Sequence, residues 1–218
     1  MFKPVRWKTF PQDFLRIQAG FLVFGFAIAM MIRANLGTSA WAVLEVAFSN
    51  LTGLTPGTWS ILVGFGVLTL ALALKEKIGW GTLANILFIG PWEDLGLWLV
   101  PSVKDNLPVQ AAMLMVAVVM MGMASAIYIG VDAGAGPRDS LMLAIKRSTG
   151  WSIRRARITI EILVVVIGWL LDGPVGIGTV IFALLIGNFV QWGFKLLHVN
   201  PHREEETVAA ESAGGVAD

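Results

Sequence analysis

Six stretches of the chain are apolar over roughly 20 residues, the length that an α-helix needs to cross the hydrocarbon core of a bilayer. They cover about residues 15–35, 56–74, 80–100, 108–130, 154–172 and 175–197. Of the 218 residues, 56% are hydrophobic and only 14% are charged, whereas soluble domains carry about 25% charged residues. A water-soluble fold of this size cannot bury so much apolar surface. The sequence therefore predicts an all-α, multi-pass membrane protein with six spanning helices.

The residues that are missing exclude several kinds of chemistry. The chain has no cysteine and only two histidines, His198 and His202, which lie beside the C-terminal tail. These absences argue against disulfides, thiolate catalysis, Fe–S clusters and the usual zinc sites. There is no P-loop, no membrane histidine for a Ser–His pair, and no G-x-G-D protease motif, since Asp132 lies in GVDAG. From these missing residues and motifs we expect no enzyme activity and no metal or cofactor. The net charge of only +1 gives no indication of a nucleic-acid partner.

Lysine and arginine predict the orientation of the chain, because they accumulate on the cytoplasmic side of a membrane. If both termini are cytoplasmic, only Arg33 and Lys104 of the sixteen lysines and arginines fall outside. The nine tryptophans lie near the ends of the expected helices, as expected for side chains that prefer the membrane interface.

An internal repeat appears when the chain is aligned with itself at an offset of 97 residues. LGTSAWAVL (36–44) then falls on AGAGPRDSL (133–141), and GWGT (79–82) falls on GIGT (176–179). Each copy holds three spans, an odd number, so the second copy must enter the membrane from the opposite face. The loops agree, because 36–56 carries no lysine or arginine whereas 131–157 is basic.

The repeat predicts a 3+3 inverted-topology architecture with simple boundaries. Residues 1–14 form a cytoplasmic N-terminal segment, 15–100 the first three-helix repeat, 101–107 an extracytoplasmic linker, 108–198 the second repeat, and 199–218 a disordered cytoplasmic tail. Each copy also contains a short apolar segment, 40–51 or 137–148. At about 18 Å of helix these segments are too short to cross, so each is either a re-entrant half-helix or an interfacial connector.

The motifs GAGPRDSL (134–141), Thr149-Gly150, R-x-x-x-E (157–161) and GPVGIGT (173–179) resemble those of the YczE-like membrane proteins. These are bacterial proteins related to the YitT group and are often described as permeases. The resemblance covers nearly all of residues 15–197 and implies a multi-pass protein of the bacterial plasma membrane. Members tend to carry Pro and Asp around the tryptophan of the first copy, where this chain has Ala40 and Ala42, so a symmetric pair of acidic groups is not expected.

The first candidate site lies at the start of the second short segment, after Gly134 and Gly136. Pro137 suits the first turn of a helix, and it is followed by Arg138 and Asp139. Arg138 either grips an anionic group of a substrate, or changes partner between two conformations, or contacts lipid headgroups or a neighbouring loop. Asp139 either shares that role or complements the helix N-terminus.

A second candidate is Glu161, about two turns into the fifth span, where ionisable side chains are expensive and face the interior. Arg157 lies four residues earlier on the same helix face, so the two can neutralise each other, with Arg138 as an expected third member.

Further polar residues lie in or near the spans. Glu93 and Asp94 follow Pro91, and they form a cation or proton site if the helix breaks there, or mark the outer surface if it does not. Glu45 and Arg33 are candidate partners at the outer face, or each is accommodated separately. The remaining candidates are Trp41, at the position of Arg138 in the first copy, and Asn85, Asn188 and Gln191, which either line a polar path or join helices.

An inverted repeat with Gly- and Pro-interrupted segments in corresponding positions is typical of transporters. The sequence therefore favours a permease of a small solute or ion, with the path between the two repeats. The alternative is a non-transporting membrane factor that assists or regulates a partner protein; a channel is a further alternative. The expected partners are the bilayer and a small substrate, and a homo-oligomer is left open.

Overall fold

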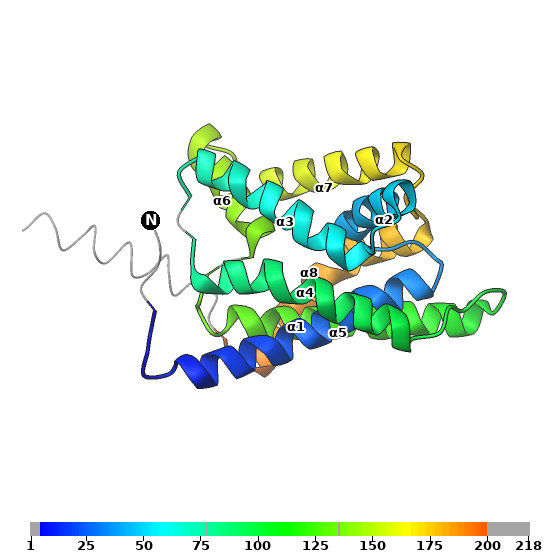
Figure 1. The fold of residues 1–218 in the computed structure, drawn as a ribbon, viewed down its shortest axis with the longest axis horizontal. Coiled ribbons are helices and arrows are strands. Elements are labelled where there is room, and N and C mark those ends of the chain that lie inside the picture. The colour runs from blue at the N-terminus through cyan, green and yellow to red at the C-terminus, as the bar shows by residue number, and fades with distance from the viewer. Residues whose placement is uncertain (1–4, 77, 135, 200–218) are drawn as a thin grey trace, which may run out of the picture.

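The computed structural model describes residues 5–76, 78–134 and 136–199. Its regular elements in these ranges are helices, shown in Figure 1. Their bounds are α1 Phe10–Arg33, α2 Ala40–Thr52, α3 Pro56–Ala73, α4 Trp80–Leu99, α5 Leu107–Ile129, α6 Pro137–Thr149, α7 Ile153–Leu170 and α8 Ile177–Leu196. The six expected long helices and the two short ones are therefore all present. The first begins at Phe10, ahead of its apolar stretch, with Pro11 in its first turn. The N-terminal residues 1–4 and the expected tail from 200 onward lie outside the described residues.

Four helices are long and apolar enough to cross a membrane, namely α1, α3, α5 and α8. The other two expected spans, α4 and α7, are helices of 20 and 18 residues. Polar side chains interrupt both: α4 contains Asn85, Glu93 and Asp94, and α7 carries three arginines in its first turns. Large apolar side chains face outward, such as Leu170 and Leu184, which are 70% and 72% exposed. A lipid environment accounts for such a surface.

The eight helices form two layers, which Figure 1 shows one above the other. The long-helix layer contains α1, α4, α5 and α8, joined by the pairs α1–α5, α1–α4 and α5–α8. The short-helix layer contains α2, α3, α6 and α7, joined by α2–α7, α3–α6, α2–α3 and α6–α7. Each layer has an apolar core, built around Phe21 and Val118 in the first and around Trp41 and Leu141 in the second. A smaller cluster that includes Leu68 of α3 and Ile86 of α4 joins the layers.

Two backbone hydrogen bonds, the glycine junctions, join the layers. Each connects the segment before a short helix, α2 or α6, to the first turn of a helix in the long-helix layer, α8 or α4. The amide of Gly178 donates to the carbonyl of Leu36 at 2.7 Å, and the amide of Gly81 donates to the carbonyl of Ala133 at 2.9 Å. Both the donors and the acceptors differ by 97 residues. The neighbouring Gly37 and Gly134 have φ of 99° and 122°, a region in which glycine is strongly preferred. An added Cβ at either glycine would meet backbone atoms, those of Gly176 and Gly79 respectively.

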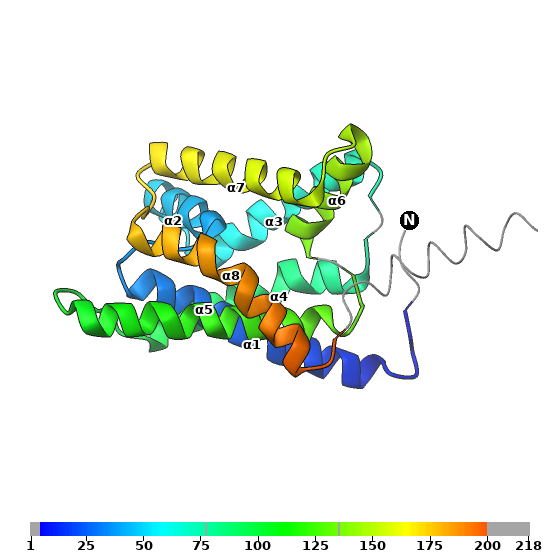
Figure 2. The same cartoon turned by 180° about the vertical axis from the view of Figure 1, so that it is seen from behind.

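The two copies differ at the boundary between the layers. In the first copy α3 packs against α4, where a Cβ added to Gly90 would overlap the carbonyl oxygen of Gly57. At the corresponding place in the second copy nothing lies within 4 Å of a Cβ added to Gly187. Figures 1 and 2 show α8 diverging from α7 after their short connection. The α3–α4 boundary is therefore closed where the equivalent α7–α8 boundary is open.

This difference predicts opposite effects of the same substitution at equivalent positions. Gly90→Ala should lower the free energy of unfolding by about 1–3 kcal/mol, because the new methyl group overlaps backbone that cannot yield. Gly187→Ala should be neutral or slightly stabilising, because alanine favours a helix and meets no neighbour. Unfolding in mixed micelles measures both, and an equal cost for the two variants would contradict the closed and open boundaries.

Candidate functional site

Local sequence determines where α6 begins and hence where Arg138 lies. Gly134 allows the chain to turn with positive φ, Gly136 is the N-cap, and Pro137 occupies the first helical position. The first turn of α6 therefore projects from the junction between the layers. Asp139 in that turn complements the positive end of the helix, as one of the two interpretations expected.

Arg138 reaches across to α2, where it has two partners one helical turn apart. Its Nη2 donates to Oε1 of Glu45 at 2.6 Å, and its guanidinium carbon lies 4.8 Å from the centre of the Trp41 ring. Glu45 is fully buried and the Arg138 side chain is 25% exposed. Trp41 and Arg138 are equivalent in the 97-residue alignment, so the two short helices meet through the same position of each copy.

This pairing rules out two of the partnerships considered from the sequence. Arg138 was a candidate third member of the Arg157–Glu161 pair, but its partner is Glu45. Glu45 and Arg33 were candidate partners of each other, but Arg33 instead donates from Nε to the carbonyl of Leu97 at 3.1 Å.

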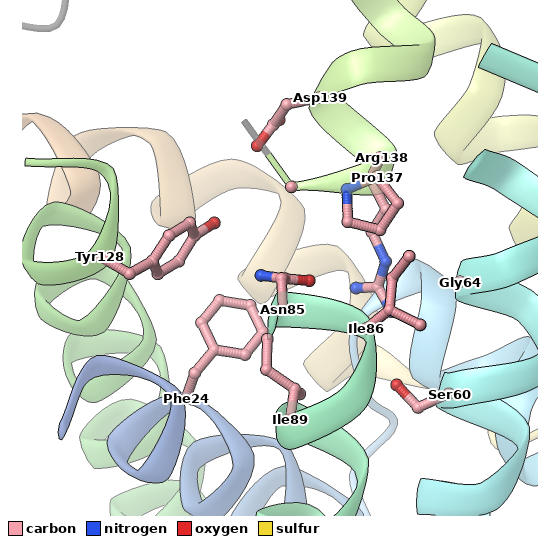
Figure 3. A pocket seen from close by; sticks show the side chains of 11 residues that line it. Phe24, Ser60, Gly64, Asn85, Ile86, Ile89, Tyr128, Pro137, Arg138 and Asp139 are labelled. Carbon is pink, nitrogen blue, oxygen red and sulfur yellow. The ribbon is translucent and has the colours of Figure 1, made fainter. Parts of the chain in front are cut away.

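A cavity opens beside Arg138, between the two layers, as Figure 3 shows. It holds about 440 Å³ of empty space, counting the solvent at its mouth. Both layers line it: the long-helix layer contributes Phe24, Asn85, Ile86, Ile89 and Tyr128, and the short-helix layer contributes Ser60, Gly64, Gly136, Pro137, Arg138 and Asp139. A mixed wall with a cation, an anion, an amide and hydroxyl groups can bind a small polar solute.

Glu93 lies one turn beyond the cavity-lining Ile89 on the same face of α4. The side chain is fully buried, and neither carboxylate oxygen has a hydrogen-bond partner among the described residues. Asp94, the next residue, accepts from Thr55 Oγ1 at 2.6 Å and from the Gly57 amide at 2.9 Å. Of the two alternatives at Pro91, the unbroken helix is observed, because α4 continues through it. Glu93 nevertheless does not mark the outer surface, since it is buried, and the two acids face different surroundings.

Arg157 and Glu161 form the expected pair, with Nε of the arginine 2.9 Å from Oε1 of the glutamate. The pair is partly exposed, at 44% and 28%. Neither residue lines the cavity, although both charges act on Asp139, which does. Asn85 lines the cavity, whereas Asn188 and Gln191 are exposed on α8. No group of three or more His, Asp or Glu side chains within 5–76, 78–134 and 136–199 is placed to hold a metal ion.

Sequence reasoning missed six of the cavity residues: Phe24, Ser60, Gly64, Ile86, Ile89 and Tyr128. A signal for two of them was present in the repeat. Ser60 and Gly64 align with Arg157 and Glu161, so the first copy has small side chains where the second copy has an ion pair. The cavity forms on the side with the small residues.

The apolar outer surface and the helix lengths define a multi-pass membrane protein. A family model described as a family of unknown function, DUF6198, matches residues 12–195. The chain is 32% identical over 173 residues to the uncharacterized membrane protein YczE of Bacillus subtilis. The aligned region covers 78% of this chain and 79% of that protein.

Two further relatives are an uncharacterized protein of Haemophilus influenzae, 32% identical over 185 residues, and the uncharacterized protein YyaS of Bacillus subtilis, 30% identical over 184 residues. The matches cover 83% of this chain in both cases, and 82% and 88% of the relatives. No solved structure matches the chain. The chain belongs to this family of YczE-like membrane proteins, which confirms the resemblance found in its motifs.

The buried pair predicts a large cost when one partner is removed. Glu45→Gln should lower the free energy of unfolding by about 1.5–3 kcal/mol, because it removes the charged, buried acceptor of the hydrogen bond that Arg138 donates. Glu161→Gln is the matched control, since its ion pair is partly exposed and should contribute less than about 0.5 kcal/mol. Unfolding of both variants in mixed micelles checks the difference, and similar small costs would contradict a buried Arg138–Glu45 pair.

Proposed function

We propose that this protein is an integral membrane transporter for a small polar solute, which passes between the long-helix and short-helix layers without chemical change. The cavity is the observation that carries this proposal, because residues of both layers line it and Arg138 forms part of its wall. Arg138 is suited to bind an anionic group of the solute, since a guanidinium binds carboxylate and phosphate oxygens in a fixed geometry.

The proposed architecture is a 3+3 inverted repeat of six spans, with α2 and α6 as re-entrant helices. Contacts that recur at the 97-residue offset support it, above all the two glycine junctions. Glycine contacts agree, because Gly25 packs on Trp92 of α4, and its equivalent Gly122 packs on Phe189 of α8. Both short helices are buried over their first half and end at an exposed glycine, Gly53 or Gly150, as expected of re-entrant segments.

The repeat supplies a mechanism for alternating access. The closed α3–α4 boundary and the open α7–α8 boundary are equivalent positions in two copies of opposite orientation. Motion of the short-helix layer about the glycine junctions would open the first and close the second. Because positive charge predicts cytoplasmic termini in a bacterial plasma membrane, the state described here is open toward the cytoplasm, where the first turns of α4 and α6 lie.

The orientation can be tested with single cysteines, since the chain has none of its own. A cysteine replacing Asn50 should react with a membrane-impermeant maleimide added outside cells, because α2 lies toward the outer face. A cysteine replacing Arg147, on the equivalent helix α6, should react only in inverted vesicles. Labelling of both from the same side would overturn the inverted repeat.

The transport proposal is tested by screening small metabolites for thermal stabilisation of the purified protein and measuring the flux of those that bind. Arg138→Gln should reduce flux in proteoliposomes at least tenfold, about 1.4 kcal/mol of lost interaction. Arg155→Gln, which replaces an exposed arginine of α7 that does not line the cavity, should change it less than twofold.

Since Arg138→Gln leaves Glu45 without a partner, the double variant with Glu45→Gln serves as a folding control. It should restore much of the stability and stay inactive. Wild-type flux in that variant would contradict the role of Arg138. A protein that binds no solute and instead copurifies with one stoichiometric partner would favour a non-transporting membrane factor.

A further inference from the structure

The boundary between the layers holds an unbalanced charge. Glu45 and Glu93 are both fully buried, and Arg138 is the cation beside them. Arg138 is already bonded to Oε1 of Glu45, whose Oε2 is buried without a hydrogen-bond partner among the described residues. Two buried carboxylates against one guanidinium leave one negative charge without compensation. A buried charge of this kind is costly.

The charged surroundings of Glu93 come from three helices. The groups that act on it are Glu45 on α2, Arg138 on α6 and Asp94 on its own helix. Asp94 already has two hydrogen-bond donors. Helix α3, which packs against α4, contains no ionisable side chain between Pro56 and Ala73. Helix α1 contributes Arg33 on this side, and that side chain bonds the carbonyl of Leu97. The remaining negative charge therefore belongs to Glu93.

One added positive charge at Glu93 removes the imbalance, and the surroundings favour a proton over a metal ion. A hard metal cation needs about six or more oxygen ligands. Glu93 has a second carboxylate near it and a guanidinium that repels cations, and the described residues contain no cluster of three acidic or histidine ligands. A proton needs only one carboxylate oxygen.

We propose that Glu93 is a proton-binding site of the transporter, and that it takes up and releases its proton as the two layers move. This inference rests on the proposed function and names its coupling ion. The step is a simple transfer: a proton from water that reaches Glu93 as the layers move forms an O–H bond with a carboxylate oxygen, and returns to water when the boundary opens to the other side.

The position of Glu93 links this proton to the movement of the layers. Glu93 belongs to the long-helix layer, whereas Glu45 and Arg138 belong to the short-helix layer. An ionised Glu93 attracts Arg138 and competes with Glu45 for it, and a protonated Glu93 leaves the Arg138–Glu45 pair intact. Arg138 thus changes partner with the state of Glu93, and the layers separate or approach accordingly.

The proton can be observed directly by infrared difference spectroscopy of the purified protein in lipid. Wild type should show a carbonyl band of a protonated carboxyl group that disappears as the pH is raised. Glu93→Gln should lose this band completely. Asp94→Asn is the matched control on the same helix, and it should keep the band because Asp94 is held by Thr55 and Gly57.

Glu93→Gln should fold, because glutamine has nearly the same size as a protonated glutamate and is likewise uncharged. Glu93→Met, which should also lose the band, is a second variant. A band that persists in both variants would overturn the proposal. Thermal stability in Na⁺ and in choline gives a second test. If Na⁺ stabilised the wild type but not Glu93→Gln, a metal cation would replace the proton and the proposal would be overturned. Because this measurement does not require flux, a proton found on Glu93 in a protein that moves no solute would refute transport and leave the proton site standing.

Discussion

The rest of the structure depends on four glycines at which backbone meets backbone. Gly37 and Gly134 turn the chain with positive φ, and Gly176 and Gly79 begin the helices that lie against them. A side chain at any of these positions would meet backbone or a neighbouring threonine, so the junctions exist only because Cβ is absent. They join the start of each short helix to the start of a helix in the other layer. The first turn of α6, and with it Arg138, is thereby held at the layer boundary.

Buried charge distinguishes this boundary from the two apolar cores. A protein held together only by the cores of its layers would have no need of Glu45, Glu93 and Arg138 between them, because replacing buried ion pairs by apolar side chains often costs nothing. Charges whose partners can change are suited to a boundary that opens and closes. The small side chains of Ser60 and Gly64 leave room for the adjacent cavity. Their equivalents in the second copy, Arg157 and Glu161, form an ion pair.

The helices and the repeat motifs could be predicted from sequence because their signals are local: apolar length, Gly and Pro punctuation, and the 97-residue offset. The partners of the charged side chains could not. Arg138 and Glu45 are 93 residues apart, and their contact depends on how the two copies interleave within one layer, whereas sequence reasoning assigned each charge to its nearest helix. The effect of Pro91 was also left open by the sequence, because surrounding helices can allow a proline within a membrane helix; in the structure α4 remains continuous.

The most direct test of alternating access uses spin-label pairs at equivalent positions of the two copies. One pair replaces Thr58 on α3 and Trp98 on α4, and the other replaces Arg155 on α7 and Lys195 on α8. Pulsed electron–electron double resonance in lipid then measures both distances under conditions that shift the conformational equilibrium, such as a change of pH or the addition of a bound solute. If the two layers alternate, the distances change in opposite directions, with the first pair lengthening as the second shortens. Single, invariant distances in both pairs would contradict alternating access.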